Sequence, residues 1–327
     1  MRASKLGLPG AVALLVFTGE AGFAQVVIST QAGLINHTQG GVRLNDQAVE
    51  PRRGQFQQMR QQDVLSTIHG RAEVLLNPGV FMRLGENSSF RLVSSQITDA
   101  RVELVSGAAI VEANEVNRDT AVTLSCQQAE VSILKRGVYR LDANPPMVRV
   151  FDGKVLVRSA GRQMEIGRGK ALALDGTLAL AKFDRKRGDW LDLWSRDRAT
   201  YLADLNLSTA RSLGSRKGLG RISGWAFNPY FGVYTFMPGS GYYCSWYGSC
   251  YYSPRQVYYA SQRVSGGWSG SSSGGGGGGS YSGSGSSVSP GAWTAGSPGA
   301  ATGSASREAP PAQSAPAPSR GGGRTAP

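Results

Sequence analysis

Hydrophobic and polar positions change period every few residues between Val26 and Lys182 and never keep a helical repeat. Short apolar or alternating runs are bounded there by Gly, Asn, Asp or Pro, a pattern typical of short β-strands joined by tight turns. The runs lie at residues 72–76, 80–84, 90–93, 101–105, 131–134, 138–141, 148–151, 155–157, 164–166 and 171–174. The pattern predicts a mainly β domain over residues 25–182.

A weak internal repeat lies inside this domain. Residues 101–113 align with residues 147–159 around the matched Gly107 and Gly153, and each copy has the form strand, glycine turn, strand. Residues 41–45 resemble the second half of the unit more faintly. Stacked units of this kind predict either a β-solenoid-like stack or a β-sandwich, and the sequence leaves both open.

The spacing of apolar residues becomes helical between Asp184 and Leu213, where Arg and Asp occupy many of the positions between them. This predicts one amphipathic helix in segment 183–213, with Asp184 or Asp189 as its N-cap and Gly214 at its end. We expect the helix to pack three aromatic side chains on the β domain: Trp190, Trp194 and Tyr201.

The remaining sequence differs sharply in composition. Residues 214–263 are rich in Tyr, Trp and Gly, and residues 264–327 in Gly, Ser, Pro and Ala, which predicts a disordered tail. Aromatic side chains in the first segment could stack on a ligand such as a sugar, or pack on their own domain, and both interpretations stay open. The candidate stacking residues are Trp225, Trp246 and Tyr247.

The start of the sequence has the order of a secretory signal peptide. Two basic residues precede a short apolar run, and Gly22-Phe23-Ala24 ends in small residues. A membrane anchor is the alternative, but Pro9 interrupts the run and Glu20 closes it below the ~20 residues that span a bilayer. We predict a signal peptide over residues 1–24 with cleavage after Ala24, a periplasmic or secreted protein, and no transmembrane span in the mature chain.

Three cysteines fit this compartment. Cys244 and Cys250 are six residues apart, and in an oxidising environment they predict a local disulfide, with two free thiols as the alternative. Cys126 lies in a strand-like stretch, where we expect a small buried hydrophobic side chain.

The formal net charge of +13 is unevenly distributed. Residues 205–327 contain nine Lys or Arg and one acidic residue, whereas residues 25–204 contain 24 basic and 20 acidic residues. A basic tail on an exported chain favours phosphate-bearing lipid or acidic polysaccharide over nucleic acid.

Catalytic or cofactor chemistry has little support in the sequence. There are two histidines, His37 and His69, and neither stands beside a Cys or a pair of carboxylates. The stretch Gly167-Arg168-Gly169-Lys170 lacks the earlier glycine and the following Ser or Thr of a phosphate-binding loop. We therefore predict a protein that is not an enzyme and uses no metal or other cofactor.

The strands also carry a family resemblance, over the segments 62–67, 70–74, 81–88, 101–113, 137–142 and 148–157. In this order they resemble the FecR domain over residues 40 to about 205. The resemblance implies a periplasmic β domain that receives or relays a signal; the best-known members respond to ferric citrate uptake through an outer-membrane transporter and control a sigma factor.

The sequence departs from those members because it predicts a cleavable signal peptide where they have a cytoplasmic anti-sigma segment and a membrane-spanning helix. We therefore expect a stand-alone envelope protein, acting as an interaction, sensing or scaffold module with envelope proteins as partners. The alternative is a module that binds glycan or cell wall through its aromatic C-terminal segment.

Overall fold

The computed structural model describes residues 26–27, 31–50, 54–117, 119–214 and 223–265. The predicted signal peptide and nearly all of the predicted disordered tail lie outside these residues. None of the helices within them is both long and apolar enough to cross a membrane.

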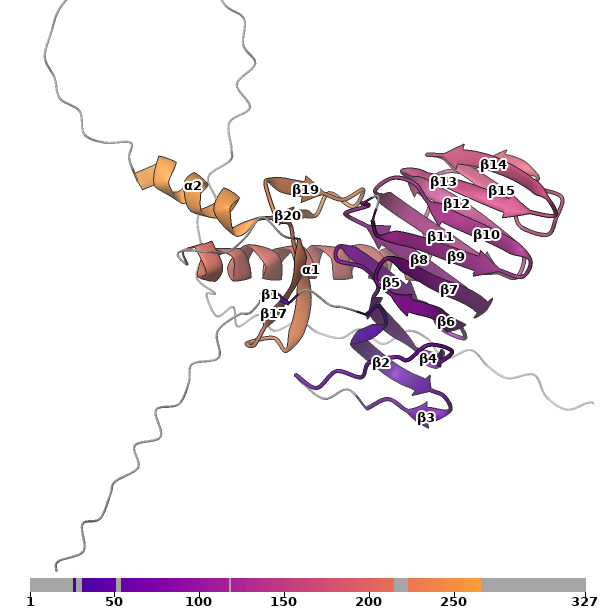
Figure 1. Cartoon of the computed structure of the whole chain (residues 1–327), viewed down its shortest axis with the longest axis horizontal. Helices are drawn as coiled ribbons and strands as arrows, with labels where there is room; N and C mark the ends of the chain where they lie inside the picture. Colours follow the sequence, from indigo (N-terminus) through magenta and orange to yellow (C-terminus); the bar gives the residue numbers. More distant parts are fainter. Residues whose placement is uncertain (1–25, 28–30, 51–53, 118, 215–222, 266–327) are drawn as a thin grey trace, which may run out of the picture. The chain divides into compact units, whose positions relative to one another are not determined.

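Most of the described strands belong to one sheet of 15 strands, which folds back on itself into two layers (Figure 1). Layer A contains β6 (Ser89–Gln96), β7 (Asp99–Ser106), β9 (Ala121–Cys126), β10 (Ala129–Ile133), β13 (Lys154–Ser159) and β14 (Arg162–Gly167). Layer B contains β5 (Val80–Leu84), β8 (Ala108–Ala113), β11 (Gly137–Ala143), β12 (Pro146–Asp152), β15 (Lys170–Ala173) and β16 (Leu180–Lys182). The inner faces share one apolar core, to which Leu92, Val131 and Val157 of layer A and Met82, Val111 and Val150 of layer B belong.

The long strand β4 (Val64–Leu75) joins the two layers. Its first residues pair with β6 and its last with β5, while β2 (Leu34–Leu44) follows its other edge and β3 (Gln47–Ala48) extends β2. The β2–β4 pair bends where Gly40 meets Gly70. A Cβ on Gly70 would lie 2.6 Å from the Gln39 carbonyl oxygen, so the two backbones can approach this closely because no side chain intervenes.

The internal repeat marks the points where the chain passes between layers. Gly107 stands between β7 of layer A and β8 of layer B, and Gly153 between β12 of layer B and β13 of layer A. Both have positive φ, at 72° and 92°. The prediction of a mainly β fold with stacked short strands is confirmed, and the two layers with one shared core make it a sandwich.

Helix α1 (Trp190–Gly214) follows, and Asp189 is its N-cap. The Asp189 Oδ1 atom accepts hydrogen bonds from the backbone N–H groups of Leu191 and Asp192, at 3.0 and 3.2 Å. Its own N–H donates to Asp192 Oδ2 at 3.0 Å, which completes a reciprocal cap. Residues 183–189 therefore precede the helix, although the predicted segment included them.

The three aromatic residues predicted to pack on the sheet have different environments. Trp194 is buried and Tyr201 is half-buried, but Trp190 is 78% exposed, so the prediction was wrong for Trp190. Leu191, Trp194 and Leu202 lie on the buried stripe of α1, whereas Trp190 lies beside that stripe in the first turn. Its ring is instead approached by the Arg71 guanidinium, at 5.8 Å from the ring centre.

The aromatic segment forms further elements beside α1. Strands β17 (Gly224–Asn228) and β18 (Val233–Met237) make a small sheet with β1 (Val26–Val27), and β19 (Tyr242–Cys244) and β20 (Cys250–Tyr252) make a hairpin. A second helix, α2 (Pro254–Ser265), was not predicted. Rings of this segment join a core with layer B: Phe81 of β5 lies 5.0 Å from Trp225 and 6.2 Å from Tyr251.

Candidate functional site

The outer face of layer B is covered by α1 and the aromatic segment, and it holds a buried charge network. The network consists of Glu73, Arg83, Glu112 and Arg198. Arg83 donates from Nε to Glu73 Oε2 at 2.9 Å and from Nη1 to Glu112 Oε2 at 2.6 Å. Arg198 of α1 donates to Glu73 Oε1 at 2.7 Å. The helix is thus joined to three strands, β4, β5 and β8, through alternating charges.

The network keeps its charges despite full burial. Burial opposes ionisation of Glu73, but the guanidiniums of Arg198 and Arg83 outweigh it and lower the pKa of this carboxyl to about 2. Burial likewise opposes the charge of Arg83, yet Glu112 and Glu73 raise its pKa. Because each of these side chains lies against one of opposite charge, the network fixes the helix on the sheet.

A second charged group, here called the Arg140 cluster, stands at the start of α1. It consists of Arg140, Asp142, Arg149, Asp189 and Asp192. Arg140 of β11 contacts Asp142 at 2.9 Å, Asp189 at 2.7 Å and Asp192 at 2.8 Å. Burial opposes ionisation of Asp189, but the hydrogen bond from Arg140 outweighs it and lowers the pKa of this carboxyl. For Asp192 the effect of burial is larger than that of its partners, and it raises the pKa.

The Arg140 cluster borders an open cleft of about 530 Å³. Phe151 and Phe183 line the cleft, with their ring centres 5.0 Å apart. Pro145 and Arg187 also line it. The cleft therefore combines an apolar wall with charges that are mostly paired.

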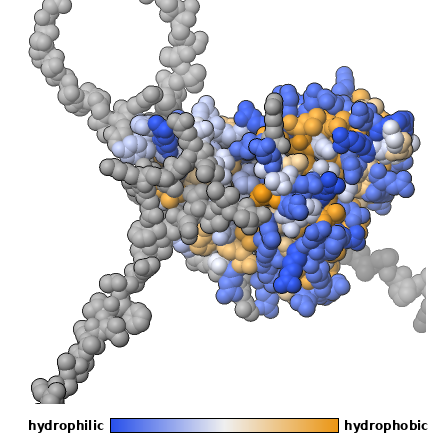
Figure 2. Space-filling view, viewed as in Figure 1, coloured by the Kyte–Doolittle hydropathy of each residue, from blue (hydrophilic) through white to orange (hydrophobic). Residues whose placement is uncertain are grey.

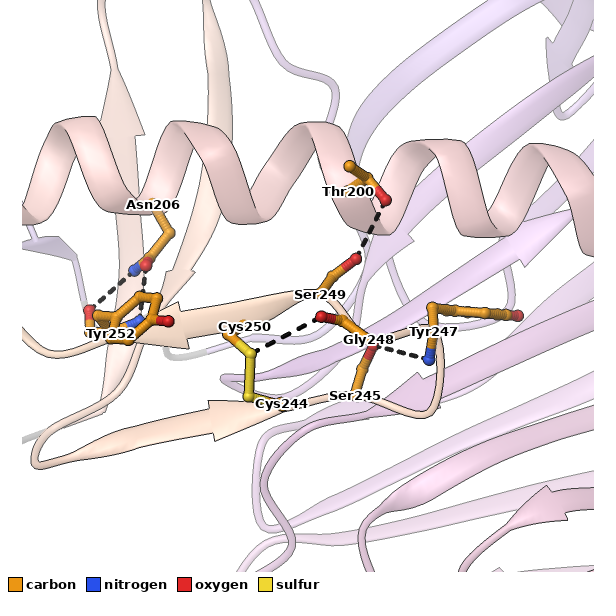
Figure 3. Close-up of a disulfide and its surroundings, with 9 residues drawn as sticks. All are labelled: Thr200, Asn206, Cys244, Ser245, Tyr247, Gly248, Ser249, Cys250 and Tyr252. Atoms are coloured by element: carbon orange, nitrogen blue, oxygen red, sulfur yellow. Dashed lines mark hydrogen bonds between the residues drawn. A yellow bond between two sulfur atoms is a disulfide. The ribbon is translucent and has the colours of Figure 1, made fainter. Parts of the chain in front are cut away.

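The disulfide predicted between Cys244 and Cys250 is present and closes the β19–β20 hairpin (Figure 3). The hairpin lies along α1: Thr200 and Ser249 hydroxyls are 3.1 Å apart, and Asn206 bonds both backbone groups of Tyr252. The hairpin thereby closes one side of the covered face.

The three candidate stacking aromatics differ in accessibility. Trp225 is 1% exposed and packs on Phe81, so no ligand ring can reach it in this structure. Tyr247 is half-buried, and its hydroxyl is a buried group without a hydrogen-bond partner among the described residues. Trp246 is half-exposed, and the guanidiniums of Arg168 and Arg185 lie 5.7 and 4.3 Å from its ring centre.

The two histidines lie on the bent β2–β4 pair. Burial, followed by the nearby charge of Arg198, lowers the pKa of His37 to about 4. His69 is exposed at the bend. Within the described residues, no group of three or more His, Cys, Asp or Glu side chains is arranged to hold a metal ion. The third cysteine, Cys126, is free and buried, and burial raises the pKa of its thiol.

Apart from Asp189, which was predicted as an N-cap, the residues of the two charged groups were not singled out by the sequence. Arg83 and Glu112 look like ordinary outward positions of alternating strands. One signal could have shown them: each stands in a strand that is apolar on both sides of the charge, as in Val80–Leu84 and Ala108–Ala113. A strand apolar on both faces is buried on both faces, and a charge within it then requires a partner.

Comparison with known families gives a match inside the sandwich. The model of the family described as FecR protein matches residues 63–156, from the start of β4 into β13. The chain contains a FecR domain. The match includes both layer-crossing glycines, Gly107 and Gly153, and three members of the buried network, so the covered face belongs to the FecR domain itself.

Solved structures give more distant similarities. Two crystal structures of a candidate anti-sigma factor from Parabacteroides distasonis ATCC 8503, at 2.50 and 1.65 Å resolution, each match 62% of this chain with 17% identity. The matches cover 90% and 92% of those chains, with TM-scores of 0.32 and 0.33. None of the curated proteins matches the sequence.

Proposed function

We propose that this FecR-domain protein is a non-catalytic interaction module in cell-surface signalling, acting outside the cytoplasm on protein partners. The observation that carries the proposal is the asymmetry of the sandwich. Layer B has its outer face occupied by α1 and the aromatic segment, whereas the outer face of layer A has no such cover among the described elements. The outer face of layer A and the turns at its edges are therefore open to partners.

The composition of that free face supports contact with a protein. Most of its outward positions are polar and half-exposed or exposed, including Arg91, Glu103, Thr123, Ser125 and Ser132, and the hydrophobic Val105 is exposed beside them. Figure 2 shows one face of the molecule, and on the sandwich hydrophilic residues surround hydrophobic ones. A mixed polar surface of this kind is common in reversible protein–protein contacts.

The proposal includes export, which the predicted signal peptide supports. N-terminal sequencing of the mature protein from the cell envelope should begin at Gln25. A chain that retains Met1 and stays in the cytoplasm would contradict this part of the proposal.

In-cell photo-crosslinking tests the interaction itself. A photo-reactive amino acid is placed at Thr123 or Ser132 on layer A, and at the exposed Asp204 of α1 as the control position. We expect the layer A positions to capture one consistent envelope protein, such as a transporter or a membrane-anchored regulator, and Asp204 to capture it weakly. Capture of polysaccharide without a consistent protein would overturn the proposal.

A further inference from the structure

The turns at one edge of the sandwich gather positive charge into a surface that we call the basic ridge. It consists of Lys135, Arg136, Lys154, Arg168, Lys170 and Arg185. These residues come from the β10–β11, β12–β13 and β14–β15 turns and from the loop before α1.

Backbone hydrogen bonds hold the turns of the ridge together. The Leu134 N–H donates to the Lys154 carbonyl at 3.0 Å, and the Gly169 N–H donates to the Val150 carbonyl at 2.8 Å. The Phe183 N–H donates to the Gly169 carbonyl at 3.3 Å, which brings the loop before α1 to the same place. The ridge is therefore a continuous surface of the fold, although its residues are spread over 51 positions of the sequence.

Positive charge exceeds negative charge at the ridge. Its six basic residues have three acidic neighbours in the same turns, strand ends and loop: Asp152, Glu165 and Asp184.

Three ridge arginines are held by aromatic rings of the β19–β20 hairpin. Arg168 and Arg185 both lie over Trp246, and Arg136 lies 4.8 Å from the ring centre of Tyr243. Arg185 also donates to the Phe151 carbonyl at 3.1 Å. These contacts fix the guanidiniums before any partner arrives, which reduces the entropy lost on binding.

The ridge charges are only partly neutralised. Lys154 pairs with Glu165 at 2.8 Å, and Arg168 approaches Asp152 at 4.0 Å. Arg136 and Arg185 form no ion pair with a carboxylate in the described part of the chain. Two guanidiniums lie at one indole ring, and only Arg168 has a carboxylate nearby, at 4.0 Å, so both keep N–H donors that can bind a further anion.

We infer that the basic ridge binds an acidic segment of a partner protein, with Arg168 and Arg185 anchoring a carboxylate beside Trp246. A protein partner is favoured because Arg, Trp and Tyr together are the residues that dominate the energetics of protein–protein interfaces. A guanidinium also matches a carboxylate with two parallel hydrogen bonds. The inference rests on the proposed function and specifies the chemistry of its partner.

Binding of the full-length protein to poly-L-glutamate tests the ridge, with the double variant Arg168→Ala/Arg185→Ala. The matched control is Arg101→Ala/Arg158→Ala, which removes the same charge from exposed positions of layer A. We expect the ridge variant to bind about tenfold more weakly and the control less than about twofold more weakly. Arg168→Lys/Arg185→Lys should fall in between, because lysine keeps the charge and loses the paired hydrogen bonds.

Three results would overturn the inference. Equal losses in the ridge variant and the control would show general attraction to a basic protein. Tighter binding of polygalacturonate, or of vesicles of anionic phospholipid, would assign the ridge to a polysaccharide or a lipid surface. If Thr123 and Ser132 still capture a protein partner in the ridge variant at undiminished yield, the proposed function stands and the ridge inference fails.

Discussion

Arg83 lies at an outward-facing position of β5, and its side chain is nevertheless completely buried. The reason is the helix above it, which supplies Arg198 to complete the alternation of charges Glu112, Arg83, Glu73, Arg198. Alternation within a strand separates its two faces, and here one of them forms the shared core of the sandwich. The alternation cannot predict that a distant helix covers the other face, so the sequence pattern did not reveal the network.

Removing one member of the network should be costly. Arg83→Met leaves Glu73 with Arg198 and the Asn36 amide as its partners and leaves Glu112 without its guanidinium, both in a buried setting. We expect a loss of about 3–5 kcal/mol in the free energy of unfolding, measured by denaturant titration. Arg91→Met breaks the Arg91–Glu103 pair, whose side chains are 40% and 32% exposed, and should cost less than about 1 kcal/mol. Similar losses in the two variants would show that the network contributes no more than a surface pair.

His37 should make stability depend on pH. Its pKa is about 4 in the folded protein against 6.5 for the free side chain, so the unfolded chain binds this proton more tightly. The neutral form therefore stabilises the fold above pH 6.5, and this contribution falls as the pH drops towards 4, by up to about 3 kcal/mol. The groups that face it are Arg198, Glu73 and Arg71.

The variant His37→Gln should remove the slope of unfolding free energy between pH 6.5 and 4.5. Below that range the slope should persist, because Glu73 becomes protonated in the unfolded state from its free value of 4.5 downward. His69→Gln changes the exposed histidine of the same strand pair and serves as the control. An unchanged slope in His37→Gln would show that burial of His37 is not its cause.

At the scale of elements, the positions of the turns were easier to predict than the layers that the turns connect. The repeated glycines, Gly107 and Gly153, were recognised as turns because only glycine adopts positive φ without strain. Each of these turns crosses between the layers because the strands on its two sides pair with different, distant strands. The local sequence pattern does not show those pairings. Of the two N-caps that the sequence left open, Asp184 and Asp189, the structure has Asp189. Local sequence could not choose between them, because both are good N-cap residues that precede the helical pattern.

The effect of steric crowding at Gly107 can be measured separately from the effect of its positive φ. A Cβ at Gly107 would overlap Ser88 Oγ and lie 2.6 Å from the Asn87 carbonyl oxygen, whereas a Cβ at Gly161 would meet nothing within 4 Å. Both residues have φ near +72°. Gly107→Ala should therefore cost about 3 kcal/mol or more, and Gly161→Ala only about 1 kcal/mol, by thermal or denaturant unfolding. Equal costs would mean that the layer crossing adapts to a side chain.

For the molecule as a whole, the aromatic segment is the part that the sequence described least well. Its Gly, Pro and Ser content suggested loops, yet it forms strands β17–β20 whose rings enter the core on layer B. Glycine and proline lower β propensity, but burial of large rings outweighs propensity when a sheet face is available to receive them. The consequence is that the FecR domain and the segment after it should unfold together.

Two truncated chains test this coupling. A chain that ends after Ser265 loses only a Gly-, Ser-, Pro- and Ala-rich sequence that cannot bury much apolar surface, so its unfolding midpoint should equal that of the full protein. A chain that ends after Gly214 loses Trp225, Phe236 and Tyr251, which pack against Phe81 and Leu202. We expect it to lose about 5 kcal/mol or more and to bind a hydrophobic dye, because the face of layer B is exposed.

Phe81→Ala in the full-length chain provides the matching point change, because Phe81 contacts both Trp225 and Tyr251 from the sheet side. If the segment and the sandwich form one cooperative unit, this variant should lower a single unfolding transition by about 3–5 kcal/mol. Two separate transitions, with the midpoint of the sandwich unchanged after truncation at Gly214, would mean that the segment is an independent appendage. In that case the outer face of layer B would become available to partners, and the asymmetry on which the proposed function rests would be lost.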